Sequence, residues 1–208
     1  DLAMMPAMPQ VEPATDDWPF LYVARRTVPS AYLIVIGGLL LVSLLAVGTL
    51  RGRSFGRSDA HFALLGMGFL LLETKSISDC SLYFGATWLV TLLVVTGVLL
   101  MVLAANVVAS RVPRLSLWFY LPLFAMLVLL CIIPRQDILA LGIAGRLLWT
   151  LLAVPLPVFF AGLIFSTGFR DAANPSLLFG ANLIGAMIGG FAEYLGMAVG
   201  SHHLSYLV

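Results

Sequence analysis

A few charged and amide side chains stand in otherwise apolar stretches of this chain, and they are the residues that could do chemistry. Glu73 and Lys75 close the run Gly68–Ile77 (GFLLLETKSI), while Asn182 and Glu193 lie in the last apolar segment. A carboxylate held away from water attracts a cation or holds a proton, and an amide both donates and accepts hydrogen bonds. These four residues are therefore candidates for buried polar positions inside a membrane.

The spacing of the first group separates its two charges. Glu73 and Lys75 are two residues apart, so on a helix their side chains point about 200° away from each other. Lys75 instead lies one turn before Asp79, which allows a local ion pair at the membrane edge. Glu73 has no such local partner, so we expect it to face other helices, where it is paired with an arginine, hydrogen-bonded or protonated.

The free energy of membrane insertion makes the position of Glu73 informative. Eight Leu, Ile, Phe and Val residues between Phe62 and Ile77 contribute roughly −2.4 to −4.8 kcal/mol, while each charge near the bilayer centre costs about 2.5 to 3.5 kcal/mol. With these opposing free energies, the helix would be only marginally stable in the membrane by itself. It should be surrounded by other helices, with Glu73 acting either as a structural anchor or as part of an ion or solute path.

The last apolar segment carries small and polar residues along one helical stripe. They recur in steps of three and four: Asn182, Gly185, Ala186, Gly189, Glu193, Gly196 and Gly200. Small residues let two helix backbones approach closely, and Gly185 and Gly189 have the GxxxG spacing. The stripe predicts a tight helix-helix seam with Glu193 buried at its end. A moving interface in a transport pathway also needs small residues, and this alternative stays open.

The composition places these residues in a membrane protein. Of the 208 residues, 61% are hydrophobic and only 10% charged, whereas a soluble domain has about 25% charged residues. A spanning helix needs about 20 mostly apolar residues. Six segments qualify, approximately 30–50, 61–77, 82–109, 115–133, 147–169 and 177–199. The expected fold is all-α, a polytopic bundle of about six transmembrane helices, and the expected location is a bacterial inner (cytoplasmic) membrane.

The remaining segments divide the chain into three parts. Residues 1–29 are rich in proline and should form an irregular interfacial arm, in which Asp16 and Asp17 could contact a ligand. Residues 30–200 form the membrane domain, and residues 201–208 form a C-terminal tail. Within the membrane domain, 134–146 should be interfacial, and Pro155 and Pro157 should kink the fifth span.

The sequence lacks the motifs that are typical of several classes of function. No phosphate-binding glycine loop, GxSxG, HExxH or zinc-type spacing occurs, so we expect no complete catalytic site, no metal and no cofactor. A net charge of +1 with no basic stripe gives no case for nucleic acid. Cys80 and Cys131 are expected to be small buried residues, and His202 and His203 to belong to a solvated tail. His61 is a weak candidate for an axial cofactor ligand.

Longer motifs resemble a known family. They are Thr15–Tyr22 (TDDWPFLY), Gly66–Ile77 (GMGFLLLETKSI), Phe84–Trp88 (FGATW), Ala161–Phe165 (AGLIF), Phe179–Ala186 (FGANLIGA) and Glu193–Met197 (EYLGM). Together they resemble the C-terminal membrane region of multispanning spermidine-synthase-like proteins. In that family a nucleotide-fold domain accompanies helices similar to transporters of the major facilitator type. The resemblance implies that residues 1–22 are the tail of a soluble domain whose cofactor-binding residues have no counterpart here.

Two functions follow as hypotheses. The first is a transporter-like membrane domain, with Glu73 and Glu193 in its interior, that handles a cationic small molecule such as a polyamine. The second is a structural or scaffold subunit of a larger membrane complex. The expected partners are the lipid bilayer, other membrane subunits and a soluble nucleotide-fold domain.

Overall fold

The computed structural model describes residues 26–51, 55–85, 87–112, 117–195 and 198, and in these residues every regular element is a helix. Most of the predicted 1–29 arm and the whole 201–208 tail, with Asp16, Asp17, His202 and His203, lie outside the described residues. The helices, in order, are α1 Ser30–Arg51, α2 Arg57–Phe84, α3 Trp88–Ala109, η2 Leu117–Phe119, α4 Tyr120–Ile132, α5 Arg135–Ala140, α6 Ile143–Leu148, η3 Trp149–Ala153, α7 Leu156–Arg170 and α8 Pro175–Glu193.

Among the described residues, four helical segments are long and apolar enough to cross a membrane, which indicates an integral membrane protein. They are α2, α3, the continuous stretch 143–170 and α8. Shorter apolar helices cover 30–45 and 117–132. The predicted all-α class is thus confirmed, and the sequence placed an apolar segment at each of these helices.

The boundaries of α2 differ from the predicted span 61–77. At its start, the Asp59 carboxylate accepts a hydrogen bond from the Gly56 N–H at 2.8 Å, which caps an extra turn. Towards its end, serine hydroxyls donate to carbonyls one turn earlier, so polar residues continue the helix. Gly85 then takes a positive φ of 86°, which favours glycine, and the next helix begins at Trp88 rather than Leu82.

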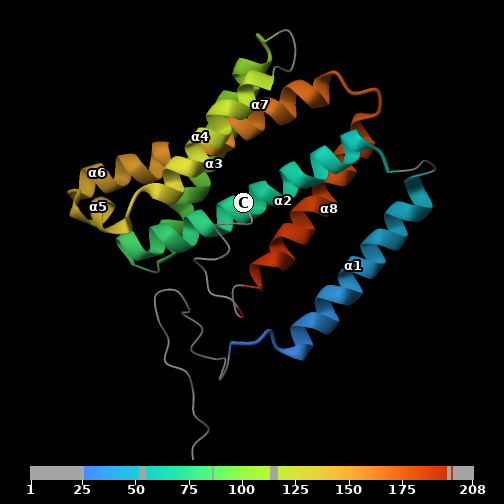
Figure 1. Cartoon of the computed structure of the whole chain (residues 1–208), viewed down its shortest axis with the longest axis horizontal. Helices are drawn as coiled ribbons and strands as arrows, with labels where there is room; N and C mark the ends of the chain where they lie inside the picture. Colours follow the sequence, from blue (N-terminus) through green and yellow to red (C-terminus); the bar gives the residue numbers. More distant parts are fainter. Residues whose placement is uncertain (1–25, 52–54, 86, 113–116, 196–197, 199–208) are drawn as a thin grey trace, which may run out of the picture.

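Helices α2 and α8 run parallel and pack closely, with α1 outside α8 (Figure 1). Gly185 lies against Ala63 and Gly189 against Met67, so the contacts advance by four residues on both helices. The Asn182 side-chain amide donates to the Phe62 carbonyl at 3.1 Å. The part of the predicted small-residue stripe that includes Asn182, Gly185 and Gly189 is therefore the surface that α8 presents to α2, whereas Gly196 and Gly200 lie outside the described residues.

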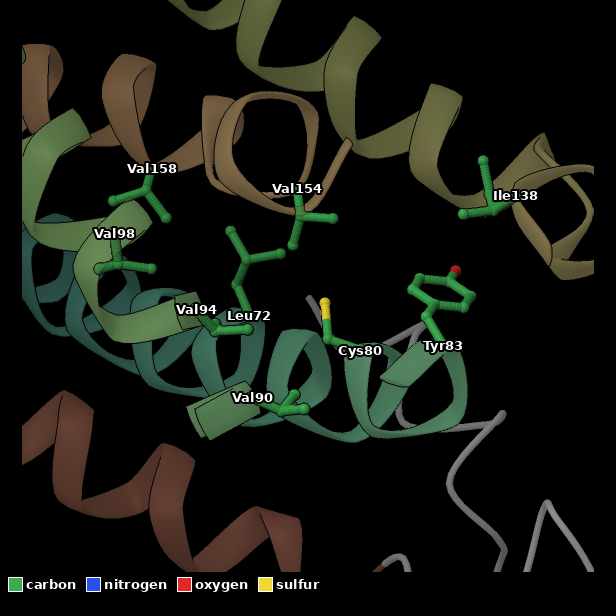
Figure 2. Packing of buried hydrophobic residues seen from close by; sticks show 9 residues of the cluster. All are labelled: Leu72, Cys80, Tyr83, Val90, Val94, Val98, Ile138, Val154 and Val158. Atoms are coloured by element: carbon green, nitrogen blue, oxygen red, sulfur yellow. The ribbon is translucent and has the colours of Figure 1, made fainter. Parts of the chain in front are cut away.

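The other side of α2 packs into an apolar core (Figure 2). Its buried members are Leu72, Cys80, Tyr83, Val90, Val94, Val98, Ile138, Val154 and Val158, from α2, α3, α5 and the 143–170 stretch. Figure 2 shows Tyr83 of α2 facing Ile138 of α5. The core thus joins two pairs of neighbouring segments, α2 with α3 and α5 with the 143–170 stretch.

The segment 143–170 contains the irregular turn expected near its prolines. Residues 149–153 form a π turn in which Val154 N–H donates to the Trp149 carbonyl at 3.0 Å, five residues earlier. Pro155 then precedes α7 and has no N–H to donate. Gly97 of α3 lies against Leu151 and Pro155, so the widened turn sits at a close helix crossing.

Candidate functional site

One face of α2, opposite its contact with α8, lines two pockets that follow one another along the helix. The residues of this face recur in steps of three and four: His61, Leu64, Leu65, Gly68, Leu72, Lys75, Ser76, Asp79 and Tyr83. Residues with this spacing share one side of a helix. Helix α4 supplies the facing wall of both pockets, so they form one groove, which we call the α2–α4 groove.

The first pocket lies near the start of α2, between α2, α4 and α7. Its volume is about 210 Å³, and its walls are mainly leucine with Phe69, Val158 and Ala161. Its main polar feature is a hydrogen bond of 2.7 Å between the His61 Nε2 and the Tyr120 hydroxyl, which joins α2 to α4. This end of the groove therefore offers two polar groups that can donate or accept a proton.

The second pocket, near the end of α2, has a volume of about 60 Å³ and holds charged groups. Asp79 accepts from the Lys75 ammonium at 2.5 Å through one oxygen and from the Arg135 guanidinium at 2.9 Å through the other. The predicted Lys75–Asp79 ion pair is thus present. Arg135, at the first position of α5, makes it a triad with two positive charges and one negative charge.

The two pockets meet at an apolar contact. Leu72 of α2 and Leu127 of α4 line both pockets. His61 and Asp79 are eighteen residues apart on one helix, which corresponds to about 27 Å along its axis. This length is close to the ~30 Å thickness of a bilayer hydrocarbon core. The groove therefore has polar groups at both ends and leucines between them.

The four polar candidates from the sequence do not meet in one site. Lys75 lines the second pocket, and Asn182 lies in the α2–α8 seam. Glu73 is half-buried but lines neither of these pockets, because it follows Leu72 and is rotated by about 100° from the groove face. Within the described part of the chain it makes no hydrogen bond or ion pair.

The expectation that Glu193 is buried is wrong for this chain, where its side chain is exposed. Gly189 and Gly190 still lie against Met67 and Leu70 of α2. Glu193 is the last residue of α8, one turn beyond these contacts. At a helix end a long charged side chain can extend away from the seam, which explains the difference.

Some residues of the groove were not expected from the sequence. Tyr120 is 59 positions from His61, and Arg135 is 56 positions from Asp79. No local spacing relates residues this far apart, so only the packing of α4 and α5 against α2 identifies them. Cys80 is buried as predicted, with its thiol 3.6 Å from the Thr150 hydroxyl, whereas Cys131 is exposed rather than buried.

Among the residues that the structure describes, no three or more His, Cys, Asp and Glu side chains are grouped so that they could hold a metal ion. What the second pocket can do chemically is bind a charged or strongly polar group, because its cations stand beside apolar walls.

No protein family, curated protein or solved structure was found to match this chain. The resemblance to spermidine-synthase-like membrane regions therefore stays a prediction.

Proposed function

We propose that this chain is a membrane transport domain that moves a small solute along the α2–α4 groove. The observation that carries this proposal is that the two pockets adjoin each other, with Leu72 and Leu127 lining both. A solute bound at either polar end would have to pass these leucines. They are the narrow apolar part of the route, and a change in their size should change the flux.

The proposal includes six membrane crossings, with α1 and α4 added to the four long segments. Helix α4 accompanies α2 from the level of His61 to that of Asp79, since Tyr120 contacts His61 and Arg135, which follows α4, contacts Asp79. If α2 crosses the bilayer, α4 covers nearly the same depth. A bacterial cytoplasmic membrane is the proposed location.

The test is a swelling assay with proteoliposomes. The purified chain is reconstituted, and uptake of acetate, butyrate, n-butylammonium, putrescine and glycerol is followed by stopped-flow light scattering. We expect faster uptake of at least one of these solutes than in empty liposomes. Leu72→Trp should lower this rate at least fivefold by filling the narrow part of the groove. Leu121→Trp is the matched control, because Leu121 is 66% exposed on α4.

Two results would contradict transport along the groove. One is uptake no faster than in empty liposomes for all five solutes. The other is equal uptake by the native chain and Leu72→Trp, provided that the variant elutes from gel filtration as the native chain does.

A second candidate function is that of a scaffold subunit in a membrane complex. The observation in its favour is α1, whose apolar side chains are largely uncovered, for example Ile34 at 74% exposure. In the described part of the chain α1 packs mainly against α8. Mild solubilisation followed by mass measurement tests this function, because a scaffold would be isolated in a stoichiometric complex and would show no flux.

The resemblance to spermidine-synthase-like proteins adds a further proposal, that a soluble nucleotide-fold domain acts together with these helices. Copurification of such a protein, with binding of an S-adenosyl ligand, would support it. The catalytic chemistry would then belong to that domain.

A further inference from the structure

The charges of the second pocket specify a class of solute. Lys75 and Arg135 face a single carboxylate, Asp79, so the triad has one net positive charge. Lys75 and Asp79 are each 19% exposed and Arg135 is 34% exposed. In such partly buried surroundings water screens charges less than in bulk solvent, so an incoming anion is attracted more strongly than at an open surface.

Both cations keep hydrogen-bond donors beyond those that Asp79 uses. A lysine ammonium has three N–H groups and an arginine guanidinium has five. In the described residues, Lys75 and Arg135 each donate one side-chain hydrogen bond, in both cases to Asp79. The remaining N–H groups can therefore donate hydrogen bonds to the two oxygens of a second carboxylate without loss of the existing pairs.

The walls of the pocket indicate what the anion carries. Leu127, Leu130, Ile133, Ile138 and Trp149 line the second pocket together with Lys75 and Asp79. An inorganic ion would leave these side chains without a contact, whereas an alkyl chain would bury apolar surface against them. The volume of about 60 Å³ suits a small head group, and the groove continues past Leu72 into the larger pocket.

We propose that the triad of Lys75, Asp79 and Arg135, of which Lys75 and Asp79 line the second pocket, binds a carboxylate attached to an apolar chain, with its oxygens shared between Lys75 and Arg135. Asp79 holds the two cations in place and repels a second negative charge. A monoanion is therefore favoured over a dianion such as phosphate. This inference rests on the proposed function only in naming the transported solute, because binding is measurable without flux. It replaces the cationic solute expected from the sequence.

Equilibrium binding to the full chain in detergent micelles tests the inference, with butyrate as the probe in isothermal titration calorimetry. Butyrate should bind more tightly than n-butanol and n-butylammonium, which have the same chain without the negative charge. It should also bind more tightly than inorganic phosphate. Lys75→Gln and Arg135→Gln should each weaken butyrate binding at least tenfold, whereas Lys75→Arg should retain it because the positive charge is kept.

Arg111→Gln is the matched control, since Arg111 is an exposed arginine that follows the C-terminal end of α3. It should bind butyrate as the native chain does. The inference is overturned if butyrate binds no better than n-butanol, if n-butylammonium or phosphate binds better, or if both glutamine variants bind butyrate normally. Circular dichroism and gel filtration confirm that each variant is folded.

A competition experiment distinguishes two sources of the carboxylate. If palmitate displaces butyrate, the site accepts fatty acids from the bilayer, and if it does not, the site accepts short acids from water. Both results support a carboxylate site. If butyrate binds but none of the five solutes is taken up, transport is contradicted and the carboxylate site is retained. If glycerol or putrescine is taken up but butyrate does not bind, transport is retained and the carboxylate site is overturned.

Discussion

At the scale of single residues, the contact between α2 and α8 depends on the absence of a side chain at Gly185. A Cβ at this position would overlap the backbone carbonyl of Ala63, which cannot move as a flexible side chain does. We therefore expect Gly185→Ala to lower the free energy of unfolding by about 1–3 kcal/mol, despite the better helix propensity of alanine. Unfolding of the purified chain in mixed micelles of rising SDS content measures this change.

Gly180→Ala provides the matched control for the seam. Gly180 is on the same helix, and a Cβ there would have no atom within 4 Å. Alanine should leave stability unchanged or raise it by up to about 1 kcal/mol through helix propensity. Equal stability of the two alanine variants would contradict the tight packing of α8 on α2.

The seam and the Lys75–Asp79 pair were predictable from the sequence, but the residues that meet them from other helices were not. Gly185 and Gly189 were identifiable because small residues four apart on an apolar helix indicate close packing. Their partner helix could not be predicted, since spacing within α8 says nothing about α2. The Lys75–Asp79 pair was predictable for the same local reason, whereas Arg135 reaches Asp79 only through the tertiary fold.

At the scale of elements, Arg146 fastens the corner made by α5 and α6 to the end of α2. Its guanidinium donates to the carbonyls of Leu139 at 2.8 Å, Leu141 at 2.9 Å and Tyr83 at 3.3 Å. Because hydrogen bonds from a charged group contribute about 1.5–3 kcal/mol each, Arg146→Gln should release this corner. We expect amide hydrogen exchange across residues 136–147 to rise at least tenfold.

The exchange of α3 provides an internal reference for this experiment. Helix α3 contributes Val90, Val94 and Val98 to the core, and within the described residues the Arg146 side chain donates no hydrogen bond to it, so its protection should be unchanged. A uniform rise in exchange over the whole chain would show global destabilisation, and unchanged exchange across 136–147 would show that Arg146 does not hold the corner.

The predicted elements were most accurate where local chemistry decides the structure. Pro155 and Pro157 predicted an irregular turn in the fifth apolar segment, because proline lacks the N–H that a regular helix needs. The π form of this turn could not be predicted from the prolines alone, and it lies where Gly97 of α3 packs against Leu151 and Pro155. The groove depends in the same way on how α4 lies beside α2.

At the scale of the whole molecule, the proposed six crossings predict which loops share a side of the membrane. Ser110 and Ala173 should then face one side, and Thr87 and Gln136 the other. All four residues are exposed. Each is replaced by cysteine in a Cys131→Ser background. Cys80 is retained because it is fully buried. Labelling of sealed vesicles of one orientation with a membrane-impermeant maleimide, before and after permeabilisation, gives the side of each position.

The same four positions distinguish six crossings from four. If only α2, α3, the 143–170 segment and α8 cross, the chain does not return through α4, and Gln136 shares the side of Ser110 while Ala173 shares that of Thr87. Ser110 therefore shares a side of the membrane with Ala173 if the chain crosses six times, and with Gln136 if it crosses four times. Because Tyr120 contacts His61 and Arg135 contacts Asp79, α4 lies beside the part of α2 between His61 and Asp79. We therefore expect Ser110 to be labelled together with Ala173, and its labelling together with Gln136 would contradict a groove that crosses the membrane.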